Sequence, residues 1–163
     1  MKSSSSEEAA AASAPAAETG GRPRVVVTGA AGMLGQAVVA EFAATHTVVP
    51  HDLATGDLAA MSPTLDWMEA QQPTLIVHCA AWTDVDGCEA DPERAWSSNA
   101  AATRNVALAA RACEADLIHL STDYVFDGAK PEPYVEDDTP APLGVYGATK
   151  LAAEKLFVQS NAY

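Results

Sequence analysis

The sequence predicts an α/β fold in which helices cover a doubly wound parallel sheet. Four apolar strand-like segments alternate with four helical patterns, an order typical of right-handed βαβ crossovers. The first strand runs directly into a glycine-rich turn that opens a helix, residues 24–35 (RVVVTGAAGMLG). A length of 163 residues and an apolar content of 48% suit one domain with a buried core.

Each element follows from its local sequence. The valines at 25–27 are β-branched and suit a strand buried on both faces. Residues 47–52 (TVVPHD) predict the second strand, in which Pro50 is expected to fray the pairing. The other elements are expected as helices over 33–44, 63–72 and 91–114, strands over 74–79 and 116–121, and a helix from Tyr146 nearly to Tyr163.

Two loops are expected after the third and fourth strands, over 80–89 and 122–145. The first lies at the carboxyl end of its strand, where ligands bind in open parallel sheets. Asp91 and Pro92 are typical of a helix N-cap and first helical position. The three carboxylates at 136–138 are interpreted as solvated rather than metal-binding, and no metal site is predicted.

Composition limits the classes of protein to consider. The formal net charge of −13 argues against nucleic-acid or anionic-membrane partners, and no segment has the ~20 apolar residues of a membrane span. Residues 1–23 lack Leu, Ile, Val and Phe and predict a disordered tail without a secretory signal. Three cysteines without C-x-x-C spacing predict free thiols in a reducing, cytoplasmic compartment.

The glycine turn predicts a dinucleotide site. Gly29 permits a sharp turn out of the strand, Gly32 lets backbone approach a pyrophosphate, and Gly35 lets the helix pack on the sheet. The unpaired N–H groups at the helix N-terminus favour an anion. Asp52 follows Gly29 by 23 residues, a position from which a carboxylate accepts hydrogen bonds from an adenosine ribose and favours NAD(H) over NADP(H). The alternatives are a purely structural turn and a solvated loop aspartate, and His51 weakens the preference for NAD(H).

Tyr146 and Lys150 stand four residues apart on the last helix and share one face. A neighbouring ammonium stabilises a phenolate and is expected to lower the tyrosine pKa from ~10 towards the working range. Thr122 follows the fourth strand and can donate a hydrogen bond to a substrate carbonyl. These three residues predict ketone reduction, although most Tyr-x-x-x-Lys pairs are structural.

The glycine spacing and the Tyr146–Lys150 pair resemble the extended short-chain dehydrogenase/reductase superfamily. Four further segments resemble the dTDP-4-dehydrorhamnose reductase family within it: AAWTDVDGCE (80–89), STDYVFDG (121–128), PYVEDDTPAP (133–142) and VYGATKLAAE (145–154). This resemblance implies a Rossmann-type, NAD(P)-binding domain over 24–163, NADPH or NADH as cofactor, and a nucleotide-sugar substrate. Some members use Mg²⁺, for which the sequence shows no motif.

The resemblance also implies roles for individual residues. The catalytic residues are Thr122, Tyr146 and Lys150, with Tyr146 as proton donor and Lys150 also holding the nicotinamide ribose. Thr122 and Asp123 contact the sugar. The implied cofactor-binding residues are Gly29, Gly32, Met33, Leu34, Gly35, Asp52, Asp57, Leu58, Ala81, Trp82, Thr83, Tyr146 and Lys150. Asn99 matches the helix asparagine that supports the active site, and a surface amide is its alternative interpretation.

Members of this family continue past the tyrosine helix, so the chain is expected to be a fragment of a longer protein, compatible with a homodimer at full length. In the usual strand order, 3-2-1-4-5-6, the fourth strand would be left as an open apolar edge. Two other functions stay open. One is a non-catalytic, NADP-binding regulatory subunit resembling the β subunit of methionine adenosyltransferase, and the other is a nucleotide-sugar epimerase or dehydratase.

Overall fold

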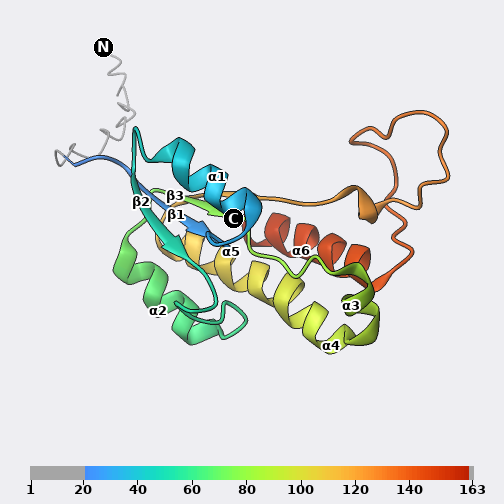
Figure 1. The fold of residues 1–163 in the computed structure, drawn as a ribbon, viewed down its shortest axis with the longest axis horizontal. Coiled ribbons are helices and arrows are strands. Elements are labelled where there is room, and N and C mark those ends of the chain that lie inside the picture. Colours follow the sequence, from blue (N-terminus) through green and yellow to red (C-terminus); the bar gives the residue numbers. More distant parts are fainter. Residues whose placement is uncertain (1–20, 162–163) are drawn as a thin grey trace, which may run out of the picture.

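A four-stranded parallel sheet forms the centre of the computed structural model, which describes residues 21–161. Residues 1–20 of the expected tail, and residues 162–163, lie outside the described residues. The strands follow the order β2-β1-β3-β4 across the sheet, and helices cover both faces (Figure 1). Their bounds are Arg24–Thr28 for β1, Thr47–His51 for β2, Leu75–His78 for β3 and Asp116–His119 for β4. The predicted doubly wound α/β fold is confirmed.

The order of the strands differs from the usual one, which places the third strand beside the second. Here β3 pairs with β1, and the expectation for that strand is wrong. After β2 the chain crosses back over β1 to its other side, so β1 and β3 lie at the point where the winding reverses. The crevice for a ligand therefore opens at the carboxyl ends of these two strands. Strand β4 lies at the edge of the sheet, as expected.

The three valines of β1 are fully buried because they face two cores alternately. Val25 and Val27 pack under helix α1 (Met33–Phe42), whereas Val26 faces Met68 of α2 (Met61–Gln71) and Val106 of α5 (Ala102–Ala112). Burial of each such side chain contributes roughly 1.5–3 kcal/mol. This packing fixes the strand from which the glycine turn begins.

Strand β2 does not fray at Pro50. The register continues through Val27 opposite Pro50 and Thr28 opposite His51. The pairing survives because β2 is an edge strand, where a residue without an N–H group need not break the ladder. The expected fraying is wrong, and His51 is thereby held at the carboxyl end of the strand.

The segment after β3 contains more helix than expected. Half of the predicted loop over 80–89 folds into α3 (Val85–Ala90), whose N-cap Asp84 accepts a hydrogen bond from the Gly87 N–H at 3.0 Å. Asp91 caps α4 (Pro92–Ala95) as predicted, accepting from the Arg94 N–H at 3.0 Å. A π-helical segment, η1 (Trp96–Ala101), joins α4 to α5.

The last helix, α6 (Val145–Asn161), begins one residue before the predicted start and packs against α5 (Figure 1). The loop before it contains a short 3₁₀ turn, η2 (Asp123–Val125). In the same loop Asp138 forms an ion pair with Lys130, at 2.5 Å between Nζ and Oδ2. None of the helices found over residues 21–161 has the length and apolarity needed to span a bilayer.

Candidate functional site

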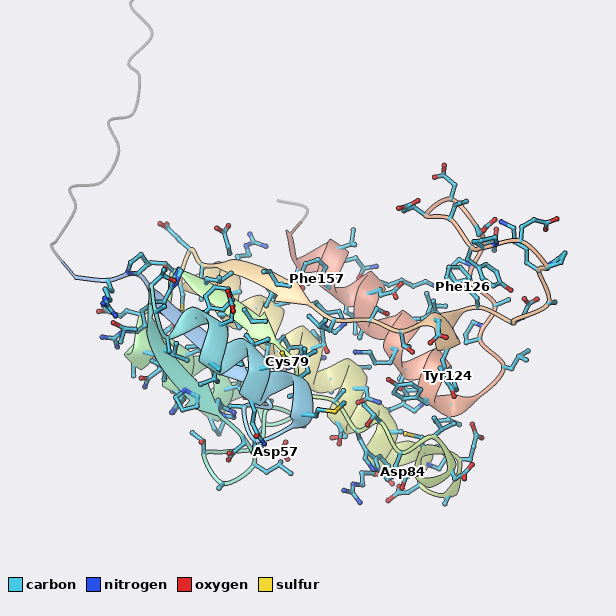
Figure 2. All side chains as sticks on the ribbon, turned by 45° about the horizontal axis from the view of Figure 1, so that its top comes forward. Asp57, Cys79, Asp84, Tyr124, Phe126 and Phe157 are labelled. Carbon is cyan, nitrogen blue, oxygen red and sulfur yellow. The ribbon has the colours of Figure 1, made fainter. Side chains whose placement is uncertain are left out.

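Two adjoining cavities open at the carboxyl ends of the central strands. The larger cavity, of about 450 Å³, extends from the glycine turn to the loop after β2 and to α4. The smaller cavity, of about 320 Å³, extends from the same turn to the end of β4 and the first turns of α6. Both are lined by Gly29, Gly32, Cys79 and Ala81. Cys79 lies at the end of β3 in the middle of the molecule, and Asp57 lies on the loop after β2 (Figure 2).

Every residue predicted to bind a cofactor lines one of these cavities. Besides the shared residues, the larger cavity is lined by Asp52, Asp57, Leu58 and Trp82. The smaller cavity is lined by Met33, Leu34, Gly35, Thr83, Tyr146 and Lys150. The fold thus gathers predicted residues from four separate segments around one elongated space, whereas Thr122 and Asp123 line neither cavity.

Two glycines of the turn cannot be replaced without a clash. Gly29 has a φ of +67°, and a Cβ there would lie 2.7 Å from the Ala80 nitrogen. A Cβ on Gly35 would lie 2.1 Å from the Gly29 carbonyl oxygen. The Ala30 N–H donates to the His51 carbonyl at 3.1 Å, which ties the turn to β2. The first N–H groups of α1 have no partner within their helix, and together with its dipole they favour an anion.

The carboxylates on the larger cavity are oriented by their own loops. Asp52 Oδ1 accepts from the Ala54 N–H and Asp57 Oδ1 from the Ala59 N–H, each at 2.9 Å. Such Asx turns hold the side chain close to the backbone. His51 beside them is buried, with its ring edge-on to another aromatic ring. Burial lowers the pKa of His51, so its imidazole adds no cation beside Asp52 at neutral pH.

Tyr146 and Lys150 lie side by side on α6, and both are almost completely buried. The Lys150 ammonium donates to the Leu120 carbonyl oxygen at 2.5 Å. Burial lowers the pKa of Lys150 to about 8, and Glu154 partly offsets this effect. The pKa of Tyr146 is raised, mainly by burial, so the expected acidic phenol is wrong. Removing the phenol from water penalises the phenolate more than its hydrogen bond with Thr122 favours it.

Thr122 is brought to Tyr146 by the 3₁₀ turn that it caps. Its Oγ1 accepts from the Tyr124 N–H at 3.3 Å and lies 3.2 Å from Asp123 Oδ1, to which it donates. The Tyr124 ring packs edge-on against Tyr146, with centroids 5.5 Å apart. The three residues predicted to be catalytic are therefore close in space although Thr122 and Tyr146 come from different segments.

Asn99 is buried in the π-helical segment and is not a surface amide. Its Oδ1 accepts from the Trp82 N–H at 2.8 Å, and its Nδ2 donates to the Trp82 carbonyl and to Thr149 Oγ1, each at 3.1 Å. These bonds connect the cavity loop to α6. The extra residue of a π turn is often found at functional sites.

His78 is a buried histidine on β3 that bonds two threonine hydroxyls. Its ring nitrogens lie 2.7 Å from Thr28 Oγ1 and 3.1 Å from Thr103 Oγ1. Burial lowers its pKa to about 3, so it is neutral at physiological pH. The three cysteines are free thiols, and burial raises the pKa of each. In the described part of the chain, no group of three or more His, Cys, Asp or Glu side chains could hold a metal ion.

Sequence reasoning missed two polar residues of the larger cavity, Arg94 and Ser98. Arg94, Ser98 and Ala102 are spaced four residues apart within the helix predicted over 91–114, so they share one face of it. This spacing could have identified Arg94 and Ser98 as residues on one face of the helix. The Arg94 guanidinium lies over the Trp82 ring, 4.1 Å from its centroid.

A family model, a curated relative and a solved structure all relate this chain to the same family of reductases. The profile described as the RmlD substrate binding domain matches residues 23–163. The dTDP-4-dehydrorhamnose reductase of Mycolicibacterium smegmatis is 39% identical over 144 residues, which cover 86% of this chain and 43% of the relative. The methionine adenosyltransferase 2 subunit beta of Mus musculus is 41% identical over 146 residues, covering 85% and 43% respectively.

Among solved structures, dTDP-4-dehydrorhamnose reductase from Bacillus anthracis in complex with NADP has a TM-score of 0.82 and 37% identity. The match covers 87% of this chain and 51% of that structure. The chain therefore spans about half the length of the relatives that it matches. The resemblance to the reductase family is confirmed. The α/β fold of the chain matches that of a reductase solved in complex with NADP.

Proposed function

The chain belongs to the family of the RmlD substrate binding domain, and on that basis we propose that the protein is an NAD(P)H-dependent reductase of a dTDP-4-keto-6-deoxysugar such as dTDP-4-dehydrorhamnose. In this proposal residues 24–163 form its dinucleotide-binding domain. The observation that carries the proposal is the placement of Tyr146 and Lys150. Both are buried on the wall of the cavity into which the glycine turn opens.

The cofactor would lie along the two cavities. Gly32, Met33 and Leu34, at the start of α1, would hold the pyrophosphate with backbone N–H groups. Asp52, Asp57 and Leu58 would contact the adenosine end, and the loop Ala81–Trp82–Thr83 would lie along the middle. A nicotinamide held there would supply the hydride for the C4 carbonyl carbon of the sugar.

Tyr146 would then donate its hydroxyl proton to the carbonyl oxygen, which completes the reduction of the ketone to an alcohol. The raised pKa keeps the phenol protonated before the reaction. The Lys150 ammonium would stabilise the phenolate that is left and would hold the nicotinamide ribose. The Thr122 hydroxyl, which donates to Asp123 Oδ1 without substrate, would turn to donate to the same oxygen, and Asp123 would contact the sugar. No step of this mechanism requires a metal ion.

Replacing Tyr146 tests the proposal. In the full-length protein, Tyr146→Phe removes the proton donor and should reduce NADPH oxidation by dTDP-4-dehydrorhamnose about 10²–10⁴-fold, followed by nicotinamide absorbance. Binding of NADPH should persist. The matched control is Tyr134→Phe, because that hydroxyl bonds Asp127 in a loop away from the cavities and its loss should leave turnover unchanged. Wild-type turnover no faster than that of Tyr146→Phe would remove the reductase proposal.

A second candidate function is a dinucleotide-binding regulatory subunit that performs no reduction. It is favoured by the identity of 41% to methionine adenosyltransferase 2 subunit beta. This function predicts NADPH binding without oxidation by any keto sugar, and a change in the activity of a methionine adenosyltransferase mixed with the protein. A nucleotide-sugar epimerase or dehydratase would instead convert its substrate without net consumption of the cofactor.

A further inference from the structure

Arg94 carries the only permanent positive charge among the described residues that line the larger cavity. The other ionisable side chains there are the carboxylates of Asp52 and Asp57, the neutral imidazole of His51, and the Cys79 thiol, whose pKa is raised by burial. The chain as a whole carries a formal charge of −13. A dinucleotide is itself an anion, so a local cation in this cavity would offset its repulsion by the two carboxylates.

The Arg94 side chain is held in place before any ligand binds. It extends from the first turn of α4, whose position is set by the Asp91 cap. Its guanidinium lies over the face of Trp82 at 4.1 Å, a cation–π contact. Asn99 in turn fixes the Trp82 backbone with two hydrogen bonds. The guanidinium therefore loses little conformational entropy when it binds an anion.

No carboxylate within residues 21–161 forms an ion pair with Arg94, since the one pair found there joins Lys130 and Asp138. A guanidinium has five N–H donors in a planar fork that matches a phosphate. Arg94 presents its charge at a cavity wall opposite the loop that follows β2.

We infer that Arg94 binds a phosphate of the dinucleotide and so completes an anion site that the glycine turn alone forms with uncharged donors. The inference rests on the proposed function, because it assumes that a dinucleotide occupies the larger cavity. Two phosphates share this chemistry: the 2′-phosphate of NADPH and the diphosphate common to NADPH and NADH. Binding to the 2′-phosphate would offset the preference for NADH that Asp52 creates.

The test compares dissociation constants of NADPH and NADH for wild type, Arg94→Met and Arg94→Lys, measured by calorimetry on the full-length protein. Arg94→Met keeps the length of the side chain but removes its charge, and it should weaken binding about tenfold or more, as expected for a charge-assisted hydrogen bond. Arg94→Lys keeps the charge and should recover part of the loss. The salt dependence of binding should also be smaller for Arg94→Met than for wild type.

The matched control is Arg24→Met, which removes the same charge at the amino end of β1, where Arg24 donates to the Gln71 carbonyl. Circular dichroism checks that each variant folds. A loss confined to NADPH identifies the 2′-phosphate, and an equal loss for both cofactors identifies the diphosphate. Unchanged binding by Arg94→Met, or an equal loss in Arg24→Met, overturns the inference. Wild-type protein that binds neither cofactor overturns the proposed function as well.

Discussion

Lys150 shows most clearly how one residue connects folding to the proposed chemistry. Its ammonium is buried against the Leu120 carbonyl, and burial lowers its pKa from 10.5 to about 8. The folded state thus releases this proton before the unfolded state does. The contribution of Lys150 to stability is therefore complete above pH 10.5 and is lost as the pH falls through about 8. At neutral pH the charged lysine costs stability, while catalysis requires the same charge.

The proposed mechanism predicts a basic limit to activity. If the Lys150 ammonium stabilises the Tyr146 phenolate, kcat/KM for keto-sugar reduction should fall as the pH rises through about 8, by about tenfold per pH unit. Glu154 accepts a hydrogen bond from Ser121 and raises the pKa of Lys150. Glu154→Gln should therefore move the midpoint of this limb to lower pH.

The control for that pH profile is Glu136→Gln, which removes a carboxylate from the exposed loop before α6 and should leave the midpoint unchanged. If Glu154→Gln and wild type share one midpoint, the basic limb does not report Lys150. The measurement is steady-state kinetics across the pH range, with folding checked at each pH.

At the scale of elements, the contact between α6 and the 3₁₀ turn η2 brings Tyr146 and Thr122 together. Gly147 makes this contact: an added Cβ would lie 2.1 Å from the Tyr124 carbonyl oxygen. The Tyr124 carbonyl belongs to the backbone and cannot move aside as a flexible side chain can. The added Cβ would therefore force α6 and η2 apart. The Asn99–Thr149 hydrogen bond fixes the opposite side of the same helix turn to η1.

Gly147→Ala should therefore destabilise the protein by about 1–3 kcal/mol, the usual cost of overpacking, although alanine in an unobstructed helix stabilises by about 1 kcal/mol. Reductase activity should fall together with stability, because Thr122 moves away from Tyr146. Gly21→Ala is the control, since an added Cβ there would meet no atom within 4 Å. Thermal unfolding measures both, and a Gly147→Ala variant as stable as wild type would show that α6 and η2 are not tightly packed.

At the scale of the whole molecule, β4 is the least protected part of the sheet. Among the strands of residues 21–161 it pairs only with β3, and Ile118 on it is 48% exposed. A strand edge with free N–H and C=O groups pairs readily with another chain. On the other side of the sheet, β2 is an edge as well, but Pro50 removes one donor there.

The 163-residue chain should therefore self-associate in a concentration-dependent way, and Ile118→Lys should reduce association because a charge blocks edge pairing. Analytical ultracentrifugation measures this directly. Val158→Lys on α6 is the control, as Val158 is exposed but belongs to no strand. A wild-type chain that stays monomeric and folds cooperatively would contradict the expectation, and equal rescue by both variants would point to general apolar contacts instead of the edge.

Local sequence was sufficient for the four strands and for most of the helices, but not for α3 or the π-helical segment, and the list of cofactor residues came from the resemblance to the reductase family. Interactions between residues close in sequence set the structure of β1, of the glycine turn and of the Asp91–Pro92 cap, so the local sequence predicts these features. The proximity of Tyr146 and Lys150 also follows from local sequence, because residues four apart on a helix share one face.

Contacts between distant segments decided the remaining features. The pairing of β3 with β1 depends on how α2 crosses the sheet, and the raised pKa of Tyr146 depends on burial by α3 and η2. Arg94 joined the larger cavity because Asn99 and Trp82 fix the loop beneath it. The burial of a side chain depends on every segment packed around it, so tertiary packing decided the pKa values of His51, Tyr146 and Lys150 at this site.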